Sequence, residues 1–354
     1  MQTRWLKSLT PMKPSWLCLT VEPNALSPEI DTQLRTLGLK PITDVDNCYC
    51  LQTEEDWSQI WRSLAPKLTE MDISARTRIG VIGGETPPVF EEVEYHHKTV
   101  EEANEISEQM WLIRAITQNT LSCTYMPVVD SRGETFGYES LVRGVDSQTG
   151  DSISGGQIFM AGKILQIEYL VDRYLHELAI KGFVEQKLKG FLFINFIPGF
   201  IQRPEYYLDG LAQAITRYHF NAKQVVLDCT NSENPRDIQH LKSIAAYCRT
   251  QGYQIALDDI ESDKSARRIL KEMNPDFIKL DMQLVQKLPG DQSALDMIYR
   301  IGTLVKHSGC PLIAEGVETE EIRHLLQTSG VSLYQGYLFS PPQPRTKPAP
   351  RKKA

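Results

Sequence analysis

Side chains that can bind metals or move protons recur where apolar runs end in the C-terminal two-thirds of the chain. They are Asn195, Asp228, Asp258, Asp259, Lys279, Asp281, Glu315, Glu318, Gln335 and, within an earlier run, Glu139. A buried strand end has no structural need for a carboxylate, because an unpaired buried charge is costly. One or two of these acids could form structural ion pairs, but four or more together would repel one another without cations. The set therefore predicts a divalent metal site whose oxygen ligands suit magnesium or manganese.

The adjacent acids Asp258 and Asp259 are the most informative pair in this set. Neighbouring side chains of a strand point to opposite faces. At a strand end, one carboxylate can therefore turn inward while the other serves a second metal ion. We expect two divalent cations at the site.

Eight apolar runs of strand length position these residues. They span 124–129, 136–142, 191–196, 224–229, 254–257, 277–280, 311–314 and 333–338. Helical patterns separate most of them from the second run onward, which predicts an α/β fold with a (β/α)8 TIM-like barrel over residues 121–344. Only residues 130–135 join the first two runs, too few for a helical crossover, so we predict that the first strand is antiparallel to the second.

The first 97 residues predict a separate small α+β domain. Strands at 16–21 and 78–82 enclose a helix capped by Ser27, a hairpin around Asp46-Asn47 and a helix at 54–68. This βαββαβ order is typical of a ferredoxin-like fold. We expect a sensory or dimerising domain. Gly83-Gly84-Glu85 resembles the signature of diguanylate cyclases, which leaves a trimmed cyclase-like relic as the alternative.

Residues 98–120 predict one long amphipathic linker helix. Thr99 and Glu102 form a capping pair, and the apolar stripe comprises Ala103, Ile106, Met110, Ile113 and Ile116. Packing on the barrel and signalling at a dimer interface both require this stripe, so both stay open. Residues 345–354 are basic and proline-rich, and they predict a flexible, solvated tail.

The overall composition is that of an ordinary globular protein, with 41% hydrophobic and 23% charged residues. A formal net charge of −7 gives no reason to expect nucleic-acid or membrane binding. No apolar run approaches the ~18–20 residues needed to span a bilayer, so we expect a cytoplasmic protein. The seven cysteines include no Cys-x-x-Cys pair, and we expect them to be reduced core residues.

Six short motifs occur in order along the barrel region: Tyr-Glu-Ser-Leu-Val-Arg at 138–143, Phe193-Ile194-Asn195, Ile255 to Asp259, Lys279-Leu280-Asp281, Ala314 to Thr319, and Gln335 to Phe339. In type and order they resemble the motifs of the EAL family, whose members bind and linearise cyclic di-GMP. Residues 138–143 resemble its Glu-Ala-Leu signature, with serine in place of alanine. The resemblance covers essentially the whole C-terminal region.

The resemblance implies metal ligands at the matching positions. The first divalent cation would be held by Glu139, Asn195, Asp228 and Asp258. Asp258 and Asp259 together would hold the second. Two metals would support in-line attack of hydroxide on phosphorus, which expels a ribose 3′-oxygen and leaves linear pGpG.

Catalytic and substrate-binding roles also follow from the resemblance. Lys279 would orient or deprotonate the attacking water, while Glu315 and Gln335 would support the second metal and its waters. Arg143 would bind a phosphate, and Leu141 and Glu318 would lie near a guanine.

Three positions depart from the family pattern. Asp228 stands where the family has glutamate, and a shift of about one ångström in the carboxylate is enough to cost ~10²-fold in rate. Asn231 replaces a second glutamate that braces a neighbouring loop. That loop reads Ile-Glu-Ser-Asp at 260–263 and lacks the family's two glycines, so its backbone cannot follow the same path cheaply.

Three functions therefore remain open. The first is a slow, magnesium- or manganese-dependent cyclic di-GMP phosphodiesterase. The second is a receptor that binds cyclic di-GMP without turnover. The third is a catalytically inactive protein–protein interaction module, and a homodimer or another protein partner is compatible with each. We favour impaired or absent turnover.

Overall fold

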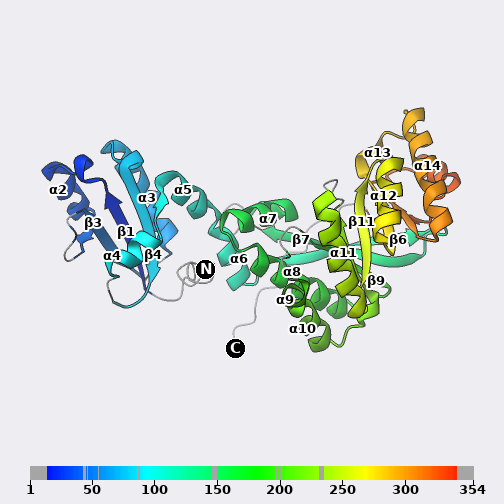
Figure 1. The fold of residues 1–354 in the computed structure, drawn as a ribbon, viewed down its shortest axis with the longest axis horizontal. Coiled ribbons are helices and arrows are strands. Elements are labelled where there is room, and N and C mark those ends of the chain that lie inside the picture. Colours follow the sequence, from blue (N-terminus) through cyan, green and yellow to red (C-terminus); the bar gives the residue numbers. More distant parts are fainter. Residues whose placement is uncertain are drawn as a thin grey trace. The chain divides into compact units, whose positions relative to one another are not determined.

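A computed structural model of the chain describes residues 14–340, apart from 43–44, 46, 55, 87, 146–149, 197, 199–200, 202 and 231–234. Asn231, Asp46 and the tail at 345–354 lie outside the described residues. The chain forms two compact units (Figure 1). The first comprises Met1–Leu121 and Gly144–Val171, and the second comprises Ser122–Arg143 and Asp172–Ala354.

The N-terminal unit contains a five-stranded antiparallel sheet. Its strands are β1 (Ser15–Val21), β2 (Lys40–Pro41), β3 (Cys48–Thr53), β4 (Thr77–Gly83) and β5 (Lys98–Thr99). They lie in the order β2-β3-β1-β4-β5, and each neighbouring pair is antiparallel. The first four strands thus have the order that the ferredoxin-like prediction requires. β5 was not predicted.

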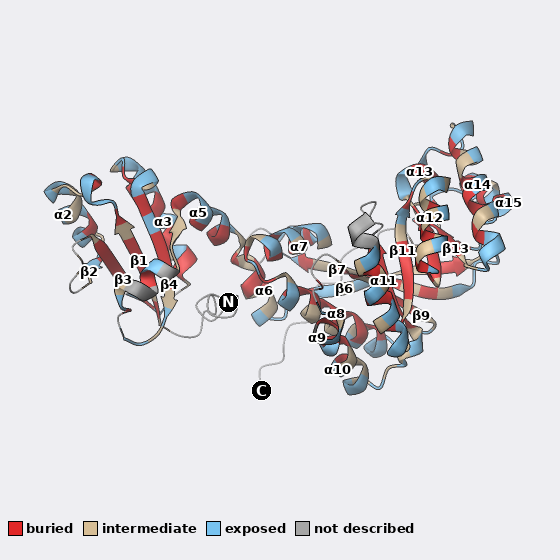
Figure 2. Cartoon of the chain, in the orientation of Figure 1, coloured by how far each residue is buried: buried red, intermediate tan, exposed pale blue. Residues whose placement is uncertain are grey.

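Helices cover this sheet, and the predicted cap of the first one is confirmed. The Ser27 side chain accepts the Ile30 N–H at the start of α2 (Pro28–Thr36), and Gly38, with φ +88°, follows its end. In α3 (Trp57–Glu70), Trp57, Trp61, Leu64 and Leu68 are buried at helical spacing. The short helix α4 (Phe90–Tyr95) was not predicted and buries Val93 among Cys18, Cys48 and Cys50. Figure 2 shows buried residues running along β1, β3 and β4.

The single linker helix predicted over 98–120 is wrong. The segment forms α5 (Val100–Gln109) and α6 (Trp111–Thr117), separated at Met110. The Met110 N–H donates to Ser107 O, three residues earlier, so the chain makes a tight 3₁₀-type turn here instead of an α-helical one. Met110 is itself buried, so tertiary packing interrupts the helix where the sequence has neither glycine nor proline. The Thr99–Glu102 capping box is present.

The N-terminal unit also includes residues that follow the second strand of the barrel. The strand β8 (Ser152–Ser154) leads into α7 (Gly155–Ile164), whose start is capped by Ser154 and Gln157. α7 packs against α5 and α6. The prediction placed residues 144–171 within the 121–344 barrel, whereas they group with the N-terminal unit.

The second unit contains the predicted barrel. Its eight strands are β6 (Ser122–Asp130), β7 (Thr135–Val145), β9 (Phe191–Phe196), β10 (Val225–Thr230), β11 (Gln254–Ile260), β12 (Phe277–Leu280), β13 (Leu312–Ala314) and β14 (Leu333–Tyr334). They follow the order β6-β14-β13-β12-β11-β10-β9-β7, and the pairing of β6 with β7 closes the ring. β6 is antiparallel to β7, as predicted, and it is also antiparallel to β14, whereas the other neighbouring pairs of the barrel are parallel.

Helices surround the barrel strands. They are α8 (Glu168–Glu185), α9 (Pro204–Tyr207), α10 (Asp209–Arg217), α11 (Pro235–Thr250), α12 (Asp263–Met273), α13 (Met282–Gln286), α14 (Gln292–Ser308) and α15 (Glu320–Thr328). Apolar residues between helices and strands form the main core of this unit. None of the helices in the described part of the chain is long and apolar enough to cross a membrane.

Candidate functional site

Two successive layers of side chains fill the interior of the barrel. The first layer is an apolar cluster that includes Phe193, Val226, Ala256, Phe277, Ile313 and Leu333. Alternate residues of a strand share a face, so the next inward position lies two residues further on. Those six positions are Asn195, Asp228, Asp258, Lys279, Glu315 and Gln335. The barrel thus places a polar layer directly above an apolar one, at the carboxyl ends of its parallel strands.

Lys279 lies at the centre of the polar layer and is fully buried. Its Nζ is 2.6 Å from Asp228 Oδ2, and it also contacts Glu315 Oε1. Glu139 Oε2 and Asp258 Oδ2 lie 3.4 and 3.5 Å from the same nitrogen. Four carboxylates from four strands therefore converge on one ammonium group.

Glu139, on β7, is held in place by two amides. Asn195 Nδ2 donates to its Oε1 at 2.8 Å, and Gln335 Nε2 donates to its Oε2 at 2.6 Å. These bonds fix the carboxylate across β9 and β14. The neighbouring Ser140, which replaces the alanine of the family signature, donates its hydroxyl to Phe193 O at 3.1 Å. The serine is satisfied within the sheet and leaves Glu139 in position.

The acids of the polar layer differ in how readily they ionise. Burial raises the pKa of Asp228 to about 8, despite the opposing charge of Lys279. Burial also raises the pKa of Glu315 well above its usual range. Burial opposes ionisation of Glu139 too, but the Lys279 charge and the two amides outweigh it and lower its pKa. The cluster thus carries more potential negative charge than Lys279 can neutralise.

The oxygen atoms of this layer fit a divalent cation. Asp228 Oδ1 and Gln335 Oε1 are buried and have no hydrogen-bond partner among the described residues. Carboxylate and amide oxygens are the ligands that magnesium and manganese favour. In the described part of the chain, no three His, Cys, Asp or Glu side chains are already arranged around a metal position. The carboxylates converge on Lys279 instead.

Other predicted site residues lie outside this central cluster. Asp259 is exposed, and its backbone has the left-handed conformation, with φ +59°. Its N–H donates to Asp258 Oδ1 at 2.8 Å. Asp281 caps α13 by accepting the Leu284 N–H, which gives this acid a structural role. Leu141 and Arg143 follow Glu139 at alternate positions of β7 and are half-buried.

Glu318 has a partner that the sequence did not indicate. Gln286 Nε2, at the end of α13, donates to Glu318 Oε1 at 3.1 Å. The two residues are far apart along the chain, so no local pattern could have linked them. Gln286 is therefore a further candidate residue at the barrel mouth.

Two glycines help to position the acid and the amide that directly follow β13 and β14, Glu315 and Gln335, and no sequence pattern had indicated them. A Cβ on Gly336 would lie 2.1 Å from Val317 O and 2.3 Å from Val317 N. Gly316 has φ +68°, which favours glycine. The Val317 N–H donates to Gln335 O at 3.0 Å, so the segments that carry Glu315 and Gln335 lie in close contact.

Comparisons with known proteins agree with this architecture. The profile of the EAL domain family matches residues 109–342. A standalone EAL protein of Vibrio cholerae, solved with cyclic di-GMP bound, is 29% identical, with a TM-score of 0.54. The likeness covers 61% of this chain and 90% of that one.

Two further relatives extend the comparison. A probable cyclic di-GMP phosphodiesterase of Escherichia coli, PdeI, is 28% identical over 68% of this chain and 32% of its own length. The S helix-GGDEF-EAL structure of Vibrio cholerae LapD is 16% identical, with a TM-score of 0.58, over 95% of this chain and 93% of that one, which shows the fold alone. The chain spans about a third of the length of the curated relatives it matches.

Proposed function

The chain belongs to the EAL domain family, and on that premise we propose that it binds cyclic di-GMP at the barrel mouth and hydrolyses it to linear pGpG slowly or not at all. The convergence of Glu139, Asp228, Asp258 and Glu315 on Lys279 carries this proposal. A cyclic di-GMP-bound EAL protein and a probable phosphodiesterase are among the relatives. Because second-messenger nucleotides act inside the cell, the proposal places the protein in the cytoplasm.

Two divalent cations, magnesium or manganese, belong to this proposal. Glu139, Asn195, Asp228 and Asp258 would hold the first, and Asp258 with Asp259 the second. When bound, such ions supply a Lewis acid for the phosphoryl group and lower the pKa of a bound water. The fit of the first site is supported by the unpartnered Asp228 Oδ1. The second is less complete, because Asp259 is exposed.

The remaining roles belong to side chains of the barrel mouth. Lys279 is the catalytic residue that would orient the attacking water, because it is the cation within the polar layer. Glu315 and Gln335 would support the second metal and its waters. The substrate-binding residues would be Leu141, Arg143 and Glu318. Arg143 would bind a phosphate through its positive charge. Its Nη1 donates to Val142 O at 2.8 Å, and a guanidinium has five N–H donors, so one such bond leaves others for a ligand.

Two features support slow or absent turnover. The Asp228 side chain is one methylene shorter than the glutamate of the family pattern. Its Oδ2 forms an ion pair with Lys279 Nζ at 2.6 Å. The loop at 260–263 lacks the family's two glycines and leads directly into α12: the Ser262 hydroxyl accepts the Ser265 N–H, and the Asp263 N–H donates to Met297 Sδ.

The proposal is tested by two measurements on the purified chain. Calorimetry with cyclic di-GMP, with and without manganese, should show binding. Chromatography after incubation at stoichiometric enzyme should show pGpG formed over hours or no pGpG. Absence of binding under all conditions would contradict the proposal, and rapid multiple turnover would contradict the impaired rate.

The alternative is a catalytically inactive EAL-like protein that acts as an interaction module, either as a homodimer or with another protein. Its supporting observation is the loop at 260–263, whose sequence departs from the family pattern and which contacts α14 through Asp263 and Met297. Intact folding without nucleotide binding would favour this alternative.

A further inference from the structure

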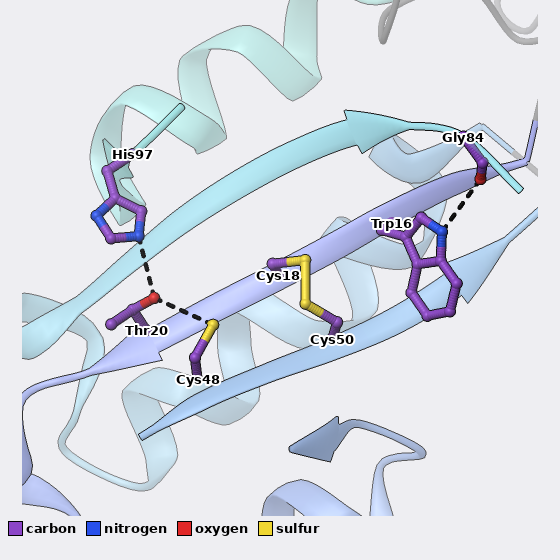
Figure 3. The surroundings of a disulfide bond; sticks show 7 residues. All are labelled: Trp16, Cys18, Thr20, Cys48, Cys50, Gly84 and His97. Atoms are coloured by element: carbon purple, nitrogen blue, oxygen red, sulfur yellow. Dashed lines mark hydrogen bonds between the residues drawn. A yellow bond between two sulfur atoms is a disulfide. The ribbon is translucent and has the colours of Figure 1, made fainter. Parts of the chain in front are cut away.

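Three cysteines lie together in the N-terminal unit. Cys18 on β1 and Cys48 and Cys50 on β3 share one buried cluster with Val93 of α4. Cys18 and Cys50 are directly opposite each other in the antiparallel register and form a disulfide (Figure 3). The expectation that all cysteines are reduced is therefore wrong, because strand pairing joins residues that are 32 positions apart. The cysteines of the barrel unit, Cys123, Cys229, Cys248 and Cys310, are free.

Cys48 is a free cysteine next to this disulfide. It lies two residues before Cys50, on the same side of β3. Thr20 Oγ1 donates to Cys48 Sγ at 3.5 Å and lies 3.0 Å from His97 Nε2 (Figure 3). Burial raises the pKa of the Cys48 thiol, so the thiolate that would attack the neighbouring disulfide is suppressed. We therefore expect Cys48 to remain a protonated thiol that does not exchange with the Cys18–Cys50 disulfide.

A small cover separates the disulfide from solvent. Cys18 and Cys50 are 0% and 4% exposed. Phe90 and Val93 of α4, with Ile42 and Val45 near β2, pack over them. α4 has six residues and no side-chain cap at its start. Short, uncapped helices open locally at lower free-energy cost than paired strands, so we expect α4 to open while the sheet stays paired.

We propose that Cys18 and Cys50 form a reversible thiol–disulfide site that reacts with a dithiol reductant when α4 opens. β1 is paired along its length with both β3 and β4, so the sheet does not depend on the covalent bond. The cytoplasmic location is part of the proposed function above, and disulfides in that compartment are mostly transient and regulatory.

The reaction is a two-electron exchange. One thiolate of the dithiol attacks Cys50 Sγ, forms a mixed disulfide and releases the Cys18 thiolate, which takes up a proton. The second thiol of the reductant then attacks the mixed disulfide, and Cys50 leaves as a thiolate that is protonated in turn. The dithiol becomes a disulfide and both cysteines become thiols. Oxidation by the disulfide form of the same reagent reverses each step.

The full wild-type chain provides the first test. It is equilibrated without denaturant in buffers of reduced and oxidised dithiothreitol, quenched with N-ethylmaleimide and mapped by peptide mass spectrometry. We expect a Cys18–Cys50 linked peptide in the oxidised buffer, its loss in the reduced buffer and its return on reoxidation. Absence of the link in every buffer would overturn the proposal. So would a link that is reduced only in urea, because that bond would be purely structural.

Serine variants provide the second test. Removing a disulfide from a unit of this size should lower the melting temperature by roughly 5–15 °C. The wild type should show this fall on reduction, whereas Cys18→Ser and Cys50→Ser should have the lower value with or without dithiothreitol. Cys48→Ser is the matched control and should keep the reductant-dependent shift. Loss of the shift in Cys48→Ser would overturn the pairing. Neither test uses nucleotide, so failure here is distinct from failure of the proposed function.

Discussion

Lys279 determines the electrostatics of the barrel mouth. It is one buried cation among four carboxylates, and two of these acids, Asp228 and Glu315, have raised pKa values because they are buried. Removing one partner of a buried ion pair leaves uncompensated charge, which costs far more than the loss of an exposed pair. Lys279 therefore stabilises the fold of this layer as well as serving the proposed chemistry.

We expect Lys279→Met to destabilise the metal-free protein by about 3 kcal/mol. Thermal unfolding in EDTA measures this loss, and manganese should restore more stability to the variant than to the wild type, since the acids then lack their cation. Lys242→Met is the control, because the Lys242–Glu272 pair is one-third exposed and its loss should cost less than about 1 kcal/mol. Equal melting temperatures for the two variants in EDTA would contradict this account.

A further buried acid, outside the polar layer, predicts a pH dependence of stability. Asp172 is fully buried, accepts a hydrogen bond from Tyr207 and lies 3.2 Å from His176 Nε2. Burial raises its pKa, despite the opposing His176 charge and the Tyr207 hydrogen bond. The folded state therefore holds this proton more tightly than the unfolded state, and stability falls as pH rises from about 4 through the raised pKa.

The variant Asp172→Asn removes this titration while keeping an acceptor for Tyr207. We expect the free energy of unfolding of the wild type, relative to this variant, to fall by about 1 kcal/mol or more between pH 4 and pH 8. Urea unfolding of both proteins across that range gives the comparison. A difference that stays constant with pH would show that Asp172 does not titrate in the folded protein.

At the scale of elements, close backbone contacts bring the β13 and β14 segments together. The Gln335 N–H donates to Ala314 O at 2.9 Å, and Gly336 lies against the Val317 backbone with no room for a Cβ. The glycine is therefore part of the site even though it carries no functional group.

We expect Gly336→Ala to destabilise the protein by roughly 3 kcal/mol, because its Cβ would overlap Val317 O and N. Chemical denaturation measures the loss. Gly290→Ala is the control, since the nearest atom to its Cβ is Lys287 O at 3.8 Å, an ordinary contact. Equal stability of the two variants would mean that the β13–β14 contact relaxes freely.

At the scale of the whole molecule, the two units are interleaved in sequence. Residues 144–171 belong to the N-terminal unit although the barrel strands β7 and β9 flank them. Their helix α7 buries Ile158 and Ala161 and packs on α5 and α6. Burial of the Ile158 side chain contributes about 1.5–3 kcal/mol, so we expect α7 to depend on elements that precede the barrel.

A fragment of residues 121–354 should therefore be less stable than one of residues 98–354, which keeps α5 and α6. We expect a melting temperature lower by roughly 5 °C or more and faster amide exchange over 155–164 in the shorter fragment. Circular dichroism and hydrogen-exchange mass spectrometry make the comparison. Identical melting and exchange would show that α7 folds on the barrel alone.

The sequence alone determined the barrel and the composition of its polar layer. Polar residues near the ends of apolar runs were recognisable, and the strand repeat of two residues then places them on one inner face: Asn195, Asp228, Asp258, Lys279, Glu315 and Gln335. The antiparallel first strand was predictable from the short connection at 130–135, and the α2 cap at Ser27 from local side-chain chemistry. These features depend on residue type and spacing over a few positions.

Only the tertiary structure decided which of these groups meet. Asp281 became a helix cap, Asp259 stayed exposed, and Gln286 joined Glu318, because these outcomes depend on backbone paths after the strands end. The break at Met110 and the return of residues 144–171 to the N-terminal unit follow from packing between distant segments. The Cys18–Cys50 bond likewise requires the register of β1 on β3, which no local pattern encodes because long-range contacts set it.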